Sequence, residues 1–372
     1  MKLTADRVLA WRMRRQLLHR PPDTDAVAVV RRLCGVQAQV ASCAEDAVAA
    51  RSARPRRGAL AERLAERSLV KTWAMRGTLH VLPTEEAAAY LALVAAARTW
   101  EKGSWQRAFV TAAQLAAITE AAREALDGAV LTREELTDRI IAATGDDTIA
   151  GHLRSGWGAV LKPLAWQGHL VHGPGDGNRV TFTSPATWLP GWRGLPEPDE
   201  AARTVIPAYL GAFGPASAAA FDQWLTRGAS RRAALRSWFA ALERAGTLTA
   251  VEVDGEPAYA RTEDLDDLAA SRRSAEVRLL PAFDQYVLGP GTGNALIIAP
   301  HRRAAVSRAA GWISPVVVAG GRVVGTWAVD GGSLDVTLFA EAGRVSGTGI
   351  EAEAARLAAV RGEPLAVRVR TD

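Results

Sequence analysis

Helices in small groups, each group closed by a short pair of β-strands, recur three times in this chain of 372 residues. This order constrains the fold most, because each group needs a small core of its own. We predict an α+β fold with a first unit over 1–83, a second over 84–190 and a third over 199–265. The first unit closes with β-like residues 69–83, where Gly77 provides the bend between two strands.

The third unit shows the order most clearly. Helices are predicted over 200–213, through Trp224 and Leu225, and from Ser230 onward, and a hairpin follows over 247–261. Three helices and then a hairpin is the winged-helix order, which is typical of proteins related to the helix-turn-helix DNA readers.

The second unit repeats this order. Thr132 and Glu135 have the spacing of a capping box, which predicts a helix start, and another helix is expected over 149–168. A strand pair over 170–172 and 179–183, joined by a glycine-rich turn over 173–177, completes the unit. Four prolines within 185–198 indicate a linker to the third unit.

Beyond Arg272 short β-prone runs predominate, among them 277–280, 287–288, 296–298, 316–318 and 322–329. They are separated by glycines and interrupted by one predicted helix over 349–361. We therefore predict a C-terminal β-barrel over 275–372.

Composition excludes several classes of protein. The two cysteines cannot build a disulfide framework, and the six histidines lack metal-ligand spacing, so we expect neither a metal site nor a cofactor. No apolar run reaches the length of a membrane span, and no signal peptide is visible at the N-terminus. A cytoplasmic location without membrane contact is the prediction.

Positive charge is carried almost entirely by arginine, with 41 arginines against four lysines and a net charge of +5. The guanidinium group can donate two parallel hydrogen bonds to a phosphate, so some pairs of adjacent arginines are candidates for contacts with a DNA backbone. Each pair taken alone could equally be part of a solvated helix face. The turn between two predicted strands near 317–324 is small and basic, and suits insertion into a groove. The DNA-binding candidates are Arg231, Arg232, Arg302, Arg303, Gly320, Gly321 and Arg322.

Twelve tryptophans are many for this length. Four of them lie at apolar helical positions and are predicted to be core residues: Trp157, Trp166, Trp224 and Trp238. Trp11 stands beside arginines and has no obvious role.

Two carboxamides interrupt an apolar segment at Gln37-Ala38-Gln39. An unmade hydrogen bond on a buried amide costs about 1–3 kcal/mol, so the pair is either satisfied within the fold or faces a water or ligand. A helix over 24–35 and a second one, opened by a capping box of Ser42 and Glu45, would leave both glutamines in the joint between them. In an extended joint the two amides share one face.

With this motif, Met75–His80, Leu280–Tyr286 and Gly320–Trp327 in view, the chain resembles the AlkZ-like family of bacterial winged-helix DNA glycosylases. The resemblance covers nearly the whole length and keeps the order of the motifs. It implies three winged-helix units and a β-barrel in a C shape around a DNA channel, with Gln37 and Gln39 as catalytic residues. Relatives with aspartate at the second position form a neighbouring subgroup, from which this chain departs at Gln39.

The resemblance also implies the reaction. A monofunctional DNA glycosylase would release N7-alkylated purines from double-stranded DNA and unhook interstrand crosslinks, in some members as self-protection of antibiotic producers. We expect a monomer that is nucleoid-associated. The roles of Arg76, His80 and Asp284 within the shared motifs stay open.

Two other classes fit the same elements. A winged-helix transcription regulator would bind a preferred sequence as a dimer, because many such modules only bind DNA. A drug-binding or interaction protein would hold its ligand in the barrel and would not depend on DNA.

Overall fold

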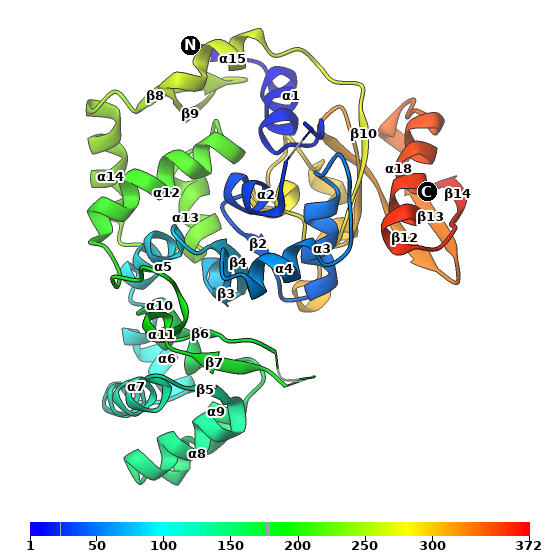
Figure 1. Cartoon of the computed structure of the whole chain (residues 1–372). Coiled ribbons are helices and arrows are strands. Elements are labelled where there is room, and N and C mark those ends of the chain that lie inside the picture. Colours follow the sequence, from blue (N-terminus) through cyan, green and yellow to red (C-terminus); the bar gives the residue numbers. More distant parts are fainter. Residues whose placement is uncertain (23, 176, 178) are drawn as a thin grey trace. The chain divides into compact units, whose positions relative to one another are not determined.

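The computed structural model describes residues 1–22, 24–175, 177 and 179–372 and has an α+β fold (Figure 1). Two compact units are present. Unit 1 comprises 1–61, 206–224 and 239–372, and unit 2 comprises 62–205 and 225–238. The predicted four-part division of the chain is a different partition, and it stays a prediction.

The described residues form these α-helices: α1 (Ala5–Arg15), α2 (Ala26–Arg32), α3 (Ala41–Ala49), α4 (Ala59–Ala65), α5 (Ala87–Ala96), α6 (Gly103–Ala108), α7 (Ala112–Leu126), α8 (Arg133–Thr144), α9 (Ala150–Arg154), α10 (Leu161–Trp166), α11 (Pro185–Trp188), α12 (Pro198–Phe213), α13 (Ala218–Thr226), α14 (Arg232–Arg244), α15 (Leu265–Ala270), α16 (Gln285–Leu288), α17 (Arg303–Val306) and α18 (Gly347–Arg361).

The strands are β1 (Lys2–Leu3), β2 (Val36–Gln37), β3 (Leu69–Trp73), β4 (Leu79–Pro83), β5 (Val130–Thr132), β6 (Val171–His172), β7 (Thr181–Thr183), β8 (Leu248–Val253), β9 (Glu256–Arg261), β10 (Val277–Leu280), β11 (Val316–Ala319), β12 (Arg322–Asp330), β13 (Ser333–Leu338) and β14 (Ala366–Thr371).

The predicted C-terminal barrel is wrong. The strands of this region form one open sheet in the order β10-β11-β12-β13-β14, in which β14 runs parallel to β13 and the other neighbours are antiparallel. Both faces of the sheet are apolar, because Val317 of β11 packs on one side and Val316 and Val318 pack on the other. The first side is covered by α18, and the second by α1 and residues 280–313 (Figure 1). Helices and loops thus bury what a closed barrel would have enclosed.

Two of the predicted strands are also wrong. Residues 287–288 belong to helix α16, whose first turn is capped by the Asp284 carboxylate through the Tyr286 N–H, and residues 296–298 lie in a turn. The apolar side chains of both segments pack in the core against one face of the sheet. Their β-prone composition is therefore explained by burial and not by strand pairing.

The element order predicted for the third unit is confirmed. Helices α12, α13 and α14 precede the antiparallel hairpin of β8 and β9. The first strand of the chain, β1, adds to the hairpin by pairing parallel with β8, which no local pattern announced.

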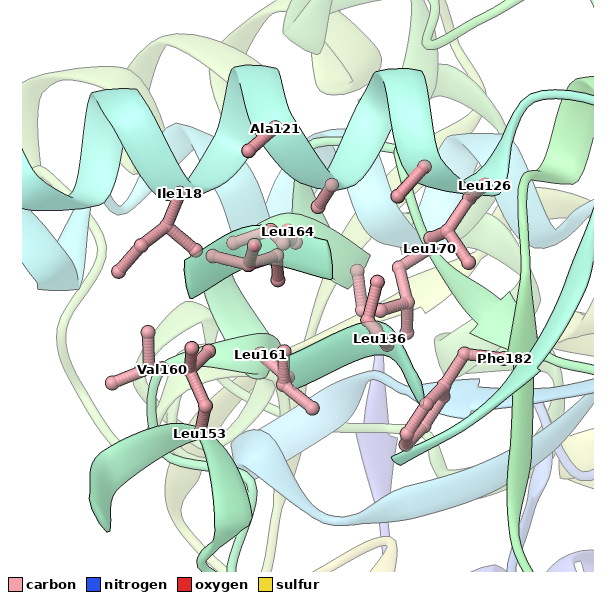
Figure 2. Close-up of a cluster of buried hydrophobic side chains, with 14 of the residues drawn as sticks. Ile118, Ala121, Leu126, Leu136, Leu153, Val160, Leu161, Leu164, Leu170 and Phe182 are labelled. Carbon is pink, nitrogen blue, oxygen red and sulfur yellow. The ribbon is translucent and has the colours of Figure 1, made fainter. Parts of the chain in front are cut away.

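In unit 2, helix α7, strand β5, helices α8 to α10 and the pair β6–β7 follow one another, and the sheet order is β5-β7-β6. The capping box of Thr132 and Glu135 at α8 is confirmed. Figure 2 shows the core, in which Ile118 and Leu126 of α7 lie over Leu161 and Leu164 of α10. Part of the predicted glycine-rich turn, residue 176, lies outside the described residues.

The single helix predicted over 149–168 is wrong, because the chain leaves the helix between α9 and α10. Gly158 there has a φ of +62°, and a Cβ at this position would overlap the ring of Trp73. The break turns Trp157 outward with 78% of its surface exposed, so its predicted core role is wrong, whereas Trp166, Trp224 and Trp238 are buried as predicted.

A close approach at Gly289 gives a stability test. A Cβ at this position would overlap the buried ring of Phe213, so we expect Gly289→Ala to destabilise the protein by about 1–3 kcal/mol. Gly293→Ala, in the same loop with open space around its Cα, is the matched control and should leave stability nearly unchanged. Urea unfolding measures both, and equal stability of the two variants would contradict the packing.

Candidate functional site

The joint that carries Gln37 and Gln39 begins with a defined helix end. After α2, the Gly35 N–H donates to the Val30 carbonyl (2.9 Å) and the Cys34 N–H to the Arg31 carbonyl (3.1 Å), which is a Schellman motif. Cys34 and Gly35 both have positive φ, at +54° and +95°. The turn reverses the chain into the short strand β2.

The two glutamines lie between α2 and α3, as predicted. Gln37 is the last residue of β2 and only 6% exposed, whereas Gln39 lies in the bend after it and is exposed. One amide is therefore held in the protein and the other is open to solvent.

The predicted capping box at α3 is wrong. The residue before α3 is Val40, whose side chain cannot cap. The Glu45 carboxylate instead accepts from the backbone N–H groups of Leu60 and Ala61, at 3.2 and 2.9 Å. These lie in the first turn of α4, where a carboxylate is favoured by the orphan N–H groups and the helix dipole. Glu45 thus ties α3 to the start of α4.

The C-terminal end of α3 is fixed by a buried ion pair. Arg51 donates two hydrogen bonds of 2.8 Å to the Asp284 carboxylate, and neither side chain has any exposed surface. The same guanidinium donates to the carbonyls of Ala47 in α3 and Gln16 after α1. Three segments of unit 1 therefore meet at one arginine, and one of them begins directly after the glutamine joint.

This pair explains the motif Leu280–Tyr286, for which the sequence suggested no role. Asp284 holds Arg51 and also caps α16, while the Tyr286 hydroxyl donates to the Gly321 carbonyl at 2.6 Å. Burial raises the pKa of the Tyr286 phenol, so it stays a neutral donor. Sequence reasoning missed Arg51, because nothing local distinguishes it from the many other arginines.

The turn between β11 and β12 is packed rather than loose. Gly321 is buried, and a Cβ there would lie 2.6 Å from the Leu9 Cβ of α1. Gly320 is half-buried, and Arg322 donates to the Leu296 carbonyl (2.9 Å) and to the Asp6 carboxylate (3.2 Å). DNA contact by these three residues stays a prediction.

The other predicted DNA contacts differ in their surroundings. Arg302 makes hydrogen bonds of 2.6–2.8 Å to Glu341 and Asp372. Hydrogen bonds from Arg302 lower the pKa of Glu341 to about 2, so this pair is charged at neutral pH. Arg303, Arg231 and Arg232 are exposed, and Arg231 and Arg232 stand at the start of α14 in unit 2.

His80 and its neighbours form a buried polar position in unit 2. His80 lies opposite Thr72 in the β3–β4 pair, fully buried, and its Nδ1 donates to the Thr78 carbonyl at 3.0 Å. Burial, with the nearby Arg76 charge, lowers the pKa of His80 to about 3. His80 is therefore a neutral imidazole, and its Nε2 has no partner among the described residues.

The two remaining open residues have structural surroundings. Trp11 is 1% exposed and packs with Leu3, Val8 and the β8 residues Val251 and Val253. Arg76 has a φ of +58° in the bend between β3 and β4, beside Gly77 at +71°. The bend that the sequence assigned to Gly77 is confirmed.

Within the ranges that the structure describes, no group of three or more His, Cys, Asp or Glu side chains could hold a metal ion. The same residues contain no helix long and apolar enough to cross a membrane.

Comparisons with known proteins agree with one another. The family model for AlkZ-like DNA glycosylases matches residues 30–360. An interstrand DNA cross-link repair glycosylase of Streptomyces sahachiroi is 50% identical over 364 residues, which cover 97% of this chain and 98% of that protein. The solved structure of Streptomyces sahachiroi DNA glycosylase AlkZ matches with a TM-score of 0.95 and 49% identity over the full length of both chains.

The buried ion pair predicts a large loss of stability on removal of one charge. Asp284→Asn leaves the Arg51 guanidinium buried without its counter-charge, and we expect a loss of about 3–5 kcal/mol in the free energy of unfolding. Asp267→Asn breaks an exposed pair with Arg14 and should cost less than about 1 kcal/mol. Similar losses in chemical denaturation would refute a special role for the buried pair.

The buried histidines predict a pH dependence. The folded-state pKa values of His80 and His172 are lowered to about 3, chiefly by burial, and lie below the ordinary value near 6.5. Below pH 6.5 the unfolded chain takes up protons that the folded state refuses, so each histidine reduces stability by up to about 1.4 kcal/mol per pH unit. Denaturation at pH 7.5 and 5.5 measures this, and NMR titration of either ring in that interval would contradict it.

Proposed function

The chain belongs to the AlkZ-like DNA glycosylase family, and from this membership we propose that it hydrolyses the N-glycosidic bond of N7-alkylated purines and unhooks DNA interstrand crosslinks. The observation that carries the proposal is the 50% identity, over almost the whole of both chains, to a protein described as an interstrand cross-link repair glycosylase. The agreement in fold supports it.

In this proposal Gln37 and Gln39 are the catalytic residues. An N7-alkylguanine is already cationic, so it leaves as a neutral base without a general acid. What remains is to orient a water at C1′ and to accommodate an oxocarbenium-like sugar. Amide oxygens can accept hydrogen bonds from that water, and their dipoles can face the developing charge.

The geometry of the joint supports these roles. Gln37 is buried at the end of β2 and Gln39 is exposed two residues later, so one amide is placed by the fold and the other can meet a ligand from solvent. Rigid anchors on both sides, the Schellman turn and the Arg51–Asp284 pair, limit the motion of the joint. Fixed dipoles stabilise a transition state without the cost of reorganisation.

Neutral amides suit labile lesions. A carboxylate would stabilise the oxocarbenium-like sugar more strongly, so amide catalysis gives less acceleration and selects bonds that are weakened by alkylation. No lysine is close to the joint in the sequence, so hydrolysis without a lyase step is the expected outcome. A crosslink is too bulky for a closed base pocket, so we propose that the lesion is met in an open channel.

The helix-and-hairpin groups are part of the proposal as winged-helix units that bind double-stranded DNA. Their element orders, α12 to β9 and α7 to β7, support this reading, and the C-shaped channel remains a prediction. We propose that the protein acts as a monomer on chromosomal DNA, which implies a cytoplasmic, nucleoid-associated location. Membership in an enzyme family disfavours the transcription regulator and the drug-binding protein.

The catalytic assignment is tested by replacing both amides. Gln37→Ala with Gln39→Ala should abolish release of 7-methylguanine from a duplex and unhooking of an N7-linked crosslink, because no group then orients the water. Binding to undamaged DNA should change little. Retention of full excision activity by the double variant would overturn the assignment, and loss of DNA binding in parallel would point to a structural role instead.

A further inference from the structure

A groove in unit 1 runs beside the turn of β11 and β12. Its volume is about 860 Å³, and its walls come from three separate segments: residues 273–277, residues 319–324 with the turn, and residues 342–351 at the start of α18. The groove therefore begins where the sequence predicted a DNA contact and extends onto residues that no motif singled out.

Two arginines give the groove its charge. Arg273 and Arg344 line it and are exposed, and neither makes an ion pair among the described residues. This sets them apart from Arg302, which is bonded to two carboxylates. Arg322 also lines the groove, but its guanidinium is shared with Asp6 and the Leu296 carbonyl. Among the described residues that line the groove, Glu351 alone carries a carboxylate.

Close packing brings Arg273 to the turn. A Cβ on Gly320 would lie 3.1 Å from the Ser274 carbonyl oxygen and 3.8 Å from Arg273 Nε. The Arg273 side chain thus passes directly over Gly320, whose φ of +57° favours glycine. The predicted contact at Gly320 and the charge of Arg273 belong to one surface.

Hydroxyl groups stand in the same groove. Ser346 and Thr348 line it, with their hydroxyls 3.0 Å apart, and Ser346 caps α18 by accepting from the Gly349 N–H. Small apolar residues such as Ala275 and Ala319 also line the groove. Guanidinium and hydroxyl groups are among the groups that contact phosphate oxygens in protein–DNA complexes.

We propose that this groove binds the phosphodiester backbone of the DNA substrate, with Arg273 and Arg344 as the phosphate contacts and Glu351 as a charge that weakens them. The inference rests on the proposed function, since it names a further surface for the same DNA. These contacts position the duplex and take no part in bond cleavage, so they act on binding for all sequences alike.

The test compares two charge-matched double variants. Arg273→Gln with Arg344→Gln should weaken binding of an undamaged duplex about 10-fold near 0.15 M salt and should reduce the slope of log K against log salt concentration by about 2. Arg54→Gln with Arg308→Gln removes two exposed arginines that lie outside the groove and outside the helix-and-hairpin groups, and should leave both quantities nearly unchanged. Fluorescence anisotropy over a salt series gives both.

The carboxylate supplies a variant of opposite sign. Glu351→Gln should tighten duplex binding and increase the salt slope, a result that damage to the fold cannot imitate. The variant Arg273→Gln with Arg344→Gln should excise 7-methylguanine at the unchanged rate when the protein is saturating, because the two arginines contribute to DNA binding and not to bond cleavage.

The outcomes separate this inference from the proposed function. Failure of the unaltered protein to release any base from alkylated or crosslinked DNA would remove the proposed function. Normal base release, together with equal duplex binding by the two double variants, would overturn the groove alone. Binding of 10 mM inorganic phosphate to the unaltered protein with no loss of duplex binding at constant ionic strength would also overturn it, since the site would then hold free phosphate rather than a DNA backbone.

Discussion

The Arg51–Asp284 pair is the interaction on which the arrangement of unit 1 depends. A guanidinium with no exposed surface has lost its hydration, and it is compensated here by two carboxylate bonds and two backbone carbonyls. Those four bonds connect the ends of α1 and α3 to the segment that leads into α16. The glutamine joint leads into α3, which has no side-chain cap at its start. The joint is therefore positioned by the Arg51–Asp284 pair at the other end of α3 and by the hydrogen bonds of Glu45 to α4.

Local signals predicted the elements well and their partners poorly. The helix order α12 to α14, the β8–β9 hairpin and the Thr132 capping box follow from periodicity and from short-range polar bonds. The prediction for Glu45 is wrong because the spacing from Ser42 to Glu45 does not exclude a partner elsewhere, and the Glu45 carboxylate accepts from the first turn of α4 instead. The barrel was wrong because β-prone composition shows that apolar strands exist but not what covers them. For the site, the motif placed Gln37 and Gln39 between two helices, whereas Arg51 and Asp284 are 233 residues apart and leave no local trace.

Basic residues in this chain serve two purposes that sequence alone cannot separate. Arg12 and Arg51 are buried and bind main-chain carbonyls, so they are structural. Arg302 lies near the surface and is bonded to the carboxylates of Glu341 and Asp372, which neutralise much of the positive charge that a ligand would meet. Arg273 and Arg344 lie in a groove, and neither forms an ion pair with a carboxylate among the described residues. The number of arginines is therefore a poor guide to the positive charge available to DNA. That charge depends on whether each arginine is already bonded to a carboxylate or a main-chain carbonyl.

The discontinuous makeup of unit 1 has a consequence for synthesis on the ribosome. Most of unit 2 is one continuous stretch, 62–205, whereas unit 1 needs three stretches that end at residue 372. Strand β1 can pair only after β8, about 250 residues later, has been synthesised, and Arg51 can form its ion pair only after Asp284 has been synthesised. Contacts of such long sequence separation form slowly, because a large loop must close before any of them is gained. The glutamine joint lies within the first 40 residues, but its anchor at Arg51 would be complete only after Asp284 has left the ribosome.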